Sequence, residues 1–201
     1  MIKRTFDIVM SSIGILMFSP VLIIIGVIIK FTSKGPVFFL QTRVGKNNKD
    51  FTIIKFRTMH INADKLGLLS FGDNDSRITS VGRLLRKFRL DELPQFYNIL
   101  MGHMSFVGPR PEVRKYVNFY NEHQKSVLNF KPGVTDFACI TYIDIEDKIL
   151  NANKNDPDSI YINNIMPKKI EANLSYFTKA NFFSDMKIIF LTISKTFNFN
   201  R

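Results

Sequence analysis

The first pattern along the chain is a long apolar run close to the N-terminus. Ile8 to Ile29 contain no charged side chain over 22 residues, and as a helix they would be about 33 Å long. That length is enough to cross a bilayer. Ser19 and Pro20 lie near the middle of the run, and a proline inside a helix removes a backbone hydrogen bond and bends the axis. The pattern predicts a bent membrane helix.

The charges around this helix leave spanning and re-entrant arrangements both open. Lys3 and Arg4 precede the run, and Lys30 and Lys34 follow it. Lysine and arginine favour the cytoplasmic side of a membrane, so cations at both ends favour a hairpin with both ends on that side. A cleaved signal peptide is a poorer interpretation, because its apolar region is usually about 7–15 residues long and no A-x-A-like site follows here.

A short polar break separates the apolar run from the rest of the chain. Residues 32–36 include Gly35 and Pro36, which are typical of a loop. We therefore expect a membrane anchor over residues 1–34 and a separate cytoplasmic domain over residues 35–201.

Two apolar segments after the break predict a β-hairpin. Residues 37–44 and 51–59 are rich in Phe, Ile, Val and Thr, and a turn-prone loop joins them. Alternation in the second strand places Lys55 and Arg57 on one face. The two cations either bind an anion there or simply face solvent.

Helical spacing occurs in three later segments. Residues 79–88 predict a helix capped by Thr79 or Ser80, with a cationic stripe, and residues 95–100 predict another with Pro94 in its first turn. Residues 182–199 predict an amphipathic helix that fits either core packing or a membrane interface. Its apolar positions are Met186, Ile189, Phe190, Ile193 and Phe197. The expected fold class is mixed α/β (α+β), with an N-terminal re-entrant helix, a small domain built from the hairpin and several helices, and some amphipathic helices at the membrane.

Composition narrows the classes of protein that remain. The 201 residues carry a net charge of +11, which indicates an anionic partner such as nucleic acid, a phosphate-bearing substrate or a membrane surface. A hydrophobic content of 45% excludes an intrinsically disordered chain. The single Cys139 excludes an intramolecular disulfide, and three scattered histidines disfavour a zinc site.

The clearest chemical signal is a pair of adjacent carboxylates, Asp91 and Glu92, just before Pro94. One interpretation is electrostatic, because carboxylates at a helix N-terminus stabilise it by about 0.3–1 kcal/mol. The other is catalytic. One carboxylate would attack a phosphate while the other holds a divalent cation that relieves the repulsion between like charges.

Arg110 is the second chemical signal. Pro109 and Pro111 restrict the backbone on both of its sides, so its guanidinium leaves a rigid loop. Such an arginine suits bidentate binding of a phosphate.

Three runs that contain these residues carry a wider resemblance. They are PVFFLQTRVGKNNKDFTIIKFRTM (36–59), DNDSRITSVGRLLRKFRLDELPQFYNIL (73–100) and MSFVGPRPE (104–112). Together with the N-terminal KRTFDI, the Ser-Pro run and the tail YINNIMPKKIEANLSYF, they resemble the bacterial sugar transferase family, the monotopic polyprenyl-phosphate phosphoglycosyl transferases. The resemblance covers nearly the whole chain.

The resemblance implies a reaction. Members of this family move a sugar 1-phosphate from a nucleotide diphosphosugar, usually a UDP-sugar, to a polyprenyl phosphate such as undecaprenyl phosphate, and release UMP. This is the first step in assembling a lipid-linked glycan. The resemblance implies that Asp91 forms a phosphosugar-aspartate intermediate and that Glu92, with Asp91, holds Mg²⁺. The residues implied to bind phosphate are Arg110, Arg86, Arg57, Lys55 and Arg77.

The resemblance also implies a location. In the family, the Ser-Pro motif, here Ser19 and Pro20, breaks the helix into a re-entrant anchor within one leaflet. The expected site is the bacterial inner membrane, with the catalytic domain on its cytoplasmic face. The expected partners are a nucleotide sugar, a polyprenyl phosphate and membrane lipid, but not nucleic acid, and a homodimer is left open.

The chain departs from the family pattern at two places. Many members read PGITGWAQ where this chain has PGVTDFAC at 132–139, and His103 replaces an acidic residue before Met-Ser. We expect the first departure to alter the nucleotide or sugar pocket. We expect residues 141–170 to shape sugar specificity.

A non-catalytic membrane scaffold that binds anionic lipid is the main rival interpretation. It accounts for the charge and the anchor, but it gives no role to the Asp91–Glu92 pair or to Arg110. A nucleic-acid binder leaves the anchor unexplained, and the sequence contains no zinc-finger or RNP-like motif. Release of UMP that depends on Mg²⁺ separates the transferase from both rivals.

Overall fold

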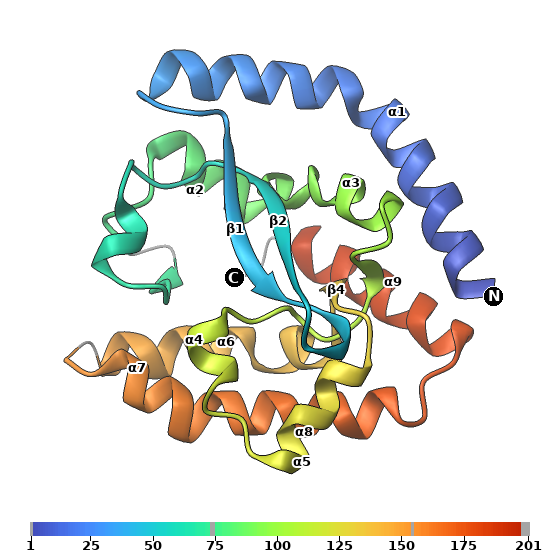
Figure 1. Cartoon of the computed structure of the whole chain (residues 1–201). Coiled ribbons are helices and arrows are strands. Elements are labelled where there is room, and N and C mark those ends of the chain that lie inside the picture. The colour runs from blue at the N-terminus through green and yellow to red at the C-terminus, as the bar shows by residue number, and fades with distance from the viewer. Residues whose placement is uncertain (1, 73–74, 154, 198–201) are drawn as a thin grey trace.

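The fold combines helices with two small sheets, in agreement with the predicted mixed α/β class (Figure 1). The computed structural model describes residues 2–72, 75–153 and 155–197, without the side chains of residues 143 and 144. Asp73 and Asn74 of the predicted polar loop, and residues 198–199 of the predicted C-terminal helix, therefore lie outside the described residues. The elements up to the carboxylate pair are α1 (Ile2–Thr32), β1 (Phe38–Val44), η1 (Lys46–Asn48), β2 (Asp50–Phe56), η2 (Ala63–Leu66), α2 (Ser80–Lys87) and η4 (Leu90–Glu92). The remaining elements are α3 (Gln95–Leu100), β3 (Ser105–Val107), α4 (Arg114–Val117), α5 (Glu122–Lys125), η5 (Ser126–Asn129), β4 (Gly133–Thr135), α6 (Phe137–Ala152), α7 (Pro157–Ile160), η6 (Tyr161–Ile165), α8 (Met166–Phe177) and α9 (Phe182–Phe197).

Helix α1 is long, apolar and bent. It continues through Pro20, and its ribbon changes direction about midway along its length (Figure 1). Pro20 has no N–H to donate to the Leu16 carbonyl, and the Ser19 hydroxyl donates to that carbonyl at 2.8 Å instead. The Ser-Pro pair therefore bends the helix while keeping this carbonyl hydrogen-bonded.

One stripe of α1 packs on the rest of the fold, and the other side is exposed. The buried positions are Asp7, Ser11, Gly14, Ile25 and Ile29. A Cβ on Gly14 would lie 2.6 Å from the Phe96 ring, so this glycine lets α1 and α3 approach closely. By length and composition α1 is able to cross a membrane. Its outer face carries many exposed apolar side chains, among them Ile13, Leu16, Ile23, Val27 and Phe31.

The predicted hairpin is confirmed, with a shorter second strand. Strands β1 and β2 pair antiparallel from Phe38 opposite Phe56 to Val44 opposite Asp50. Phe56 packs with Ile25 and Ile29 of α1, while Ile53 packs with the helix α3 residue Ile99. The hairpin thus contacts α1 on one side and α3 on the other.

The predicted helices at 79–88 and 95–100 are confirmed as α2 and α3. The Thr79 hydroxyl accepts a hydrogen bond from the Gly82 N–H at 2.9 Å, as expected of an N-cap. Gly82 is required by packing, because a Cβ there would lie 2.0 Å from the Thr58 carbonyl oxygen. This close approach sets α2 directly beside the end of β2.

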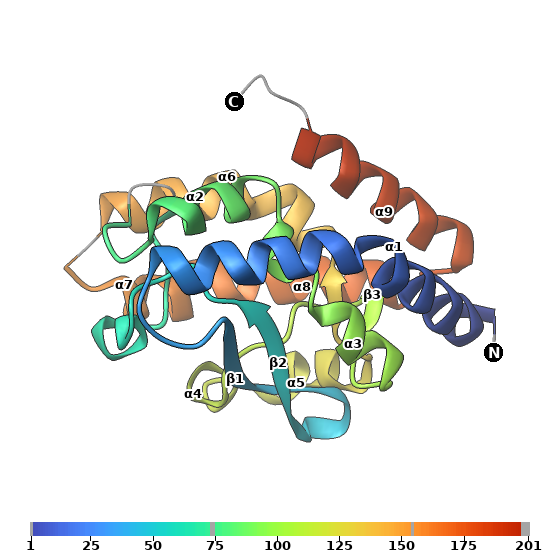
Figure 2. The ribbon, with the colours of Figure 1, turned by 90° about the horizontal axis from the view of Figure 1, so that it is seen from above.

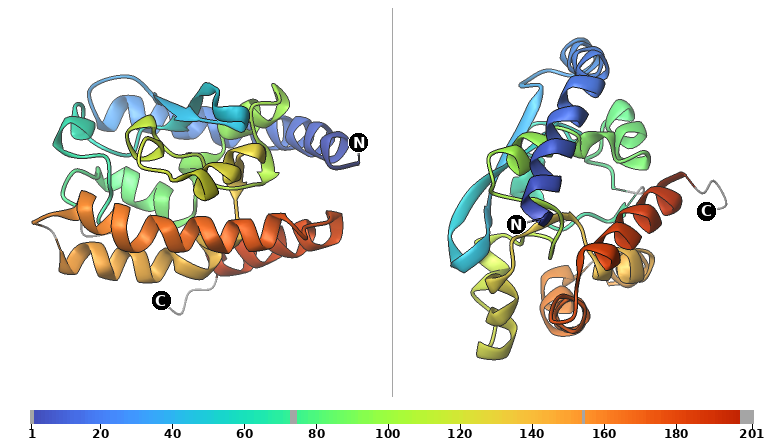
Figure 3. Two further views of the ribbon diagram at one scale, coloured as in Figure 1. Left: turned by 60° about the horizontal axis from the view of Figure 1, so that its bottom comes forward. Right: turned by 90° about the vertical axis from the view of Figure 1, so that its right-hand side faces the viewer.

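The C-terminal half supplies a second core and a second sheet. Strands β3 and β4 pair in parallel, with Ser105 opposite Gly133 and Val107 opposite Thr135. Helices α6 and α8 lie side by side, as Figure 3 shows, and the core beneath them includes Tyr116, Leu150, Tyr161 and Ile170.

Helix α9 confirms the predicted C-terminal helix. Its apolar stripe is only partly buried. Asp185 and Ile188 are buried against the fold. Phe190, Ile193 and Phe197 are exposed, with Phe190 at 70%. Figure 2, from above, shows α9 on the same side of the hairpin as α1 and α2. Core packing therefore accounts for only part of the apolar stripe of this helix.

Candidate active site

The carboxylate pair lies in the tight connection between α2 and α3. Arg89 ends α2 with φ 53°, a left-handed conformation that turns the chain sharply into η4. Leu93 and Pro94 then continue in helical conformation into α3. Asp91 and Glu92 are both buried at this turn, 9% and 6% exposed. The turn holds two neighbouring carboxylates where helices and hairpin meet.

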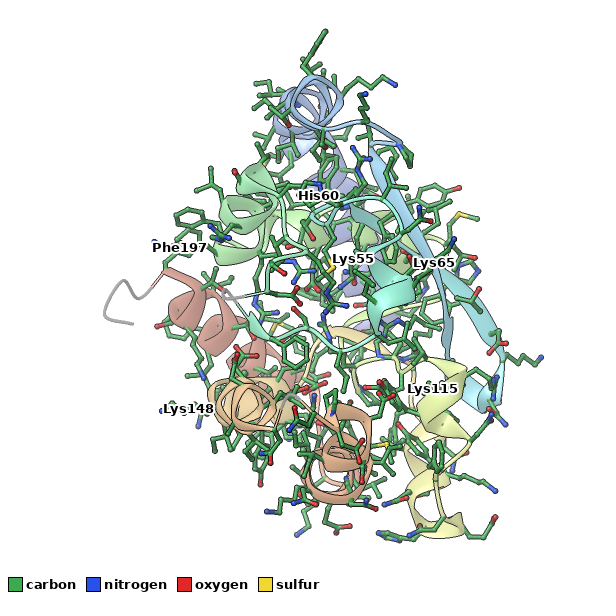
Figure 4. All side chains as sticks on the ribbon, turned by 90° about the vertical axis from the view of Figure 1, so that its left-hand side faces the viewer. Lys55, His60, Lys65, Lys115, Lys148 and Phe197 are labelled. Atoms are coloured by element: carbon green, nitrogen blue, oxygen red, sulfur yellow. The ribbon has the colours of Figure 1, made fainter. Side chains whose placement is uncertain are left out.

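Glu92 is held by three cations from different parts of the chain. Its Oε1 accepts hydrogen bonds from Lys55 Nζ at 2.7 Å and from Arg110 Nη2 at 2.6 Å. Its Oε2 lies 3.7 Å from Arg89 Nη1. Figure 4 shows Lys55 near the centre of the molecule, whereas Lys115 and Lys148 lie toward its edges. Lys55 and Arg110, two of the residues implied to bind phosphate, thus both contact the carboxylate pair.

These contacts fix the charge of Glu92. Burial alone would raise its pKa, but Arg110, Lys55 and Arg89 outweigh burial and hold the pKa of Glu92 well below its usual value. In return, Glu92 raises the pKa of Arg110. Burial lowers the pKa of Lys55, and Glu92 opposes that change. Glu92 is therefore a permanent anion over the range in which most enzymes work.

The environment of Asp91 raises its pKa, in contrast to that of Glu92. The Asp91 carboxylate makes no hydrogen bond or ion pair with any residue in the described part of the chain. Burial, and then the negative charge of Glu92, raise the pKa of Asp91, while Lys55, Arg86 and Arg110 limit the rise. Asp91 therefore has no hydrogen-bond partner in the described ranges that a ligand would have to displace, and its raised pKa makes the ionised form more basic.

Arg86 is fixed beside Asp91 by two hydroxyl groups. Its Nε donates to Thr58 Oγ1 and its Nη1 donates to Ser70 Oγ, both at 2.9 Å. Burial lowers the pKa of Arg86, and the charge of Asp91 raises it. The guanidinium is thus oriented by neutral partners and leaves its charge available to the carboxylate and to an incoming anion.

The Pro109–Pro111 loop is held from three sides. The Arg110 N–H donates to Asp136 Oδ2 at 2.7 Å, Arg43 Nη1 donates to the Pro111 carbonyl at 3.0 Å, and the Val44 N–H donates to the Glu112 carbonyl at 2.8 Å. Asp136 also caps α6 through the Cys139 N–H. With its backbone fixed, the side chain of Arg110 remains 32% exposed and able to meet a ligand.

Two of the predicted phosphate-binding residues lie outside this cluster. Strand β2 ends at Phe56, and the Arg57 guanidinium binds Ser33 and the Lys34 carbonyl at the C-terminal end of α1. Arg77 pairs with Asp75 at 2.6 Å and donates to backbone carbonyls of residues 63–69. The structure gives these two arginines structural partners, and it groups Lys55, Arg86 and Arg110 around the carboxylates.

The carboxylate pair fits a magnesium ion. Glu92 Oε2 is buried and accepts no hydrogen bond from a described residue, and Asp91 adjoins it. No group of three or more His, Cys, Asp or Glu side chains that could hold a metal occurs in the described ranges. Mg²⁺ usually binds one or two carboxylates together with substrate phosphates, so it does not need such a group.

Two residues that sequence reasoning missed belong to the site. Arg89 stands three residues before Glu92, a spacing at which side chains on a helical turn meet, and this spacing was the available signal. Asp136, within the departure at 132–139, fixes the Arg110 backbone. Its contact with a segment far away in sequence left no local signal.

Comparison with known proteins places this chain in a family. Residues 1–199 match the family described as bacterial sugar transferase. The chain is 39% identical over 195 residues to the UDP-N-acetylgalactosamine-undecaprenyl-phosphate N-acetylgalactosaminephosphotransferase of Aeromonas hydrophila, an alignment that covers 96% of this chain and 43% of that protein. It is 38% identical over 202 residues to the UDP-glucose:undecaprenyl-phosphate glucose-1-phosphate transferase of Klebsiella pneumoniae, covering 97% and 40%.

A shorter relative aligns over most of its own length. The uncharacterized sugar transferase EpsL of Bacillus subtilis is 36% identical over 195 residues, covering 96% of this chain and 86% of that protein. The chain spans about two fifths of the length of the two larger relatives.

Proposed function

Since this chain belongs to the bacterial sugar transferase family, we propose that it transfers a sugar 1-phosphate from a UDP-sugar to undecaprenyl phosphate. This would begin the assembly of a lipid-linked glycan. The activities of the Aeromonas and Klebsiella relatives support these substrates. The observation that carries the proposal is the pair of unlike carboxylates. Asp91 has no hydrogen-bond or ion-pair partner among the described residues, whereas Lys55 and Arg110 hold Glu92.

The proposed reaction has two displacements at one phosphorus atom. In the first, an Asp91 carboxylate oxygen attacks the phosphorus attached to the sugar, and the bond from that phosphorus to the bridging oxygen breaks, so that UMP leaves with this oxygen. In the second, a phosphate oxygen of undecaprenyl phosphate attacks the same phosphorus, and the bond to Asp91 breaks. The carboxylate is then restored.

The cations around the pair explain how an anion attacks an anion. Lys55 and Arg110 are anchored on Glu92, and Arg86 is anchored on two hydroxyls, so all three charges are in place before substrate binds. The raised pKa of Asp91 makes its ionised carboxylate more basic than an ordinary aspartate. Both features favour attack on a phosphate.

Glu92 and Asp91 would hold Mg²⁺ in this proposal. The bound ion would neutralise charge on the diphosphate and polarise its oxygens. Glu92 suits this role because its pKa is held low and its Oε2 has no hydrogen-bond partner among the described residues.

We also propose that α1 is a re-entrant anchor in the bacterial inner membrane, with the rest of the chain on the cytoplasmic face. At its N-terminal end, Lys3 Nζ pairs with Asp185 at 2.6 Å and Arg4 donates to the Ile99 carbonyl at 2.6 Å. At its C-terminal end, Arg57 binds the carbonyls of Ser33 and Lys34. Both ends therefore contact one folded body, which supports placing them on one side of the bilayer.

The test is release of UMP by detergent-solubilised protein with undecaprenyl phosphate, Mg²⁺ and a panel of UDP-sugars. We expect wild type and the surface variant Glu122→Gln to release UMP, and Asp91→Asn to lose this activity. Release should require the lipid phosphate for sustained turnover and should stop on removal of Mg²⁺. Equal release by wild type and Asp91→Asn would exclude the covalent mechanism. Release by neither protein would favour the lipid-binding scaffold.

A further inference from the structure

Arg89 occupies a backbone position that suits glycine. It follows the last turn of α2 with φ 53° and ψ 21°, the left-handed conformation in which helices commonly end. An L-residue with a side chain is disfavoured there, because its Cβ crowds the neighbouring backbone. If this position did no more than end α2, glycine would adopt the left-handed conformation at a lower energy. We therefore look for a function of the arginine side chain.

The Arg89 side chain has unused binding capacity. Its guanidinium makes no hydrogen bond to any residue within the described ranges, and its nearest anion, Glu92 Oε2, lies 3.7 Å away. Lys55 and Arg110, in contrast, each hydrogen-bond to the other oxygen of Glu92. The side chain of Arg89 is 31% exposed, so a ligand can reach it from solvent.

We propose that Arg89 binds a substrate phosphate beside Asp91. This inference rests on the proposed function and adds a residue to it. The guanidinium offers five N–H donors in a planar fork that matches phosphate oxygens, and Arg89 is separated from Asp91 by a single residue of the turn. Both substrates present the same chemistry, a diphosphate in the donor and a phosphate in the lipid acceptor.

The decisive comparison separates backbone strain from side-chain function. In Arg89→Gly the left-handed conformation becomes favourable, so we expect a melting temperature about 2–4 °C above that of wild type. We expect kcat/KM for UMP release to fall at least about tenfold, the effect of losing one charged hydrogen bond. The matched control is Asn47→Gly, because Asn47 has φ 56° in the hairpin turn, at the opposite end of β2 from Lys55. It should gain stability without losing activity.

A second pair of variants keeps the backbone unchanged. Arg89→Lys and Arg89→Gln both retain a side chain at this φ, but only lysine retains the charge. We expect Arg89→Lys to keep several-fold more activity than Arg89→Gln, and this pair decides the question if Arg89→Gly folds poorly. Activity of Arg89→Gly within twofold of wild type, or equal activity of the lysine and glutamine variants, would overturn the proposal.

Two kinetic measurements show whether Arg89 binds the donor diphosphate or the phosphate of the lipid acceptor. A slower single turnover of UMP release without acceptor would place Arg89 on the donor diphosphate. A raised KM for undecaprenyl phosphate, with an unchanged single turnover, would place it on the acceptor. If wild type uses no donor, the proposed function fails, and inorganic diphosphate becomes the probe. It should then raise the melting temperature of wild type more than that of Arg89→Gln, and equal shifts would refute the role of Arg89.

Discussion

Asp91 and Glu92 are adjacent, yet their surroundings move their pKa values in opposite directions. Three cations outweigh burial at Glu92 and keep it ionised, whereas at Asp91 burial and the negative charge of Glu92 outweigh the cations nearby. The difference in pKa between these two carboxyl groups thus depends on which of them the cations contact directly. Lys55 and Arg110 both reach Glu92, and no described side chain hydrogen-bonds Asp91.

The dependence of Asp91 on Arg86 gives a prediction about pH. The charge of Arg86 lowers the pKa of Asp91, so Arg86→Gln should raise it further. Attack requires the ionised carboxylate, and therefore kcat/KM should begin to fall at a higher pH in Arg86→Gln than in wild type as the solution is acidified. The pH profile of UMP release with one UDP-sugar measures the shift.

Arg83→Gln is the matched control for this experiment. Arg83 lies on the same helix, three residues earlier, and is exposed to solvent. Its removal should leave the acid limb of the profile where it is in wild type. An unchanged limb in Arg86→Gln as well would mean that Arg86 does not act on the ionisation of Asp91.

At the residue scale, the sequence was informative where chemistry is local. The adjacent carboxylates and the proline-flanked Arg110 can be recognised in the sequence, and in the structure Arg110 hydrogen-bonds to Glu92. Alternation placed Arg57 beside Lys55, but the partners of Arg57 are backbone carbonyls at the end of α1, more than twenty residues away. No periodicity in the second strand encodes such a partner.

At the element scale, Arg77 organises the loop that contains Ser70, a hydrogen-bond partner of Arg86. The Arg77 guanidinium pairs with the buried Asp75 and donates to the carbonyls of Ala63, Gly67 and Leu69. Burial would raise the pKa of Asp75, but hydrogen bonds from Arg77 and from backbone N–H groups lower it to about 2. The ion pair between Arg77 and Asp75 therefore helps to hold the base of this loop.

Asp75→Asn should destabilise the fold in a pH-dependent way. The folded pKa of Asp75 lies below its ordinary value of 3.8, so its contribution is present above that value and is lost as the pH falls toward about 2. We expect a loss of about 2 kcal/mol at pH 7, equivalent to a melting temperature lower by about 4–8 °C. Thermal unfolding in detergent at pH 7, 4 and 3 measures the difference, which should shrink as the pH falls.

The control for this loop is Asp64→Asn. Asp64 lies in η2 of the same loop and its side chain is exposed. It should melt like wild type at every pH. Equal melting of Asp75→Asn and wild type at pH 7 would show that the ion pair with Arg77 does not stabilise the loop.

Elements were predictable to the extent that their signals are short-range. The Thr79 cap, the hairpin and the helix after Pro94 all appear at the expected places. The parallel pairing of β3 with β4 joins segments 28 residues apart, from Ser105 to Gly133, and these strands are only three residues long. Strands this short have no alternation to detect, so this sheet was not predicted.

At the scale of the whole molecule, the contacts of α1 make a prediction about sidedness. Ile2 and Lys34 stand at opposite ends of the anchor and both are exposed. In inverted inner-membrane vesicles, we expect Ile2→Cys and Lys34→Cys both to react with a membrane-impermeant maleimide. In right-side-out vesicles neither should react.

Wild type is the control for background labelling, because its single Cys139 is buried. Reaction of the two introduced cysteines from opposite sides would mean that α1 spans the membrane. The contacts of Lys3, Arg4 and Arg57 could not then all exist in the membrane-bound protein.

In the proposed topology, the product emerges on the same face of the membrane as both ends of α1. In the proposed reaction, the sugar arrives, is transferred and remains on the side of the bilayer where nucleotide sugars are made. Enzymes that lengthen the glycan from the same cytosolic pool can act on the product at once. Delivery of the finished glycan to the other side then requires a separate transporter that carries the sugar-bearing end of the lipid across the bilayer.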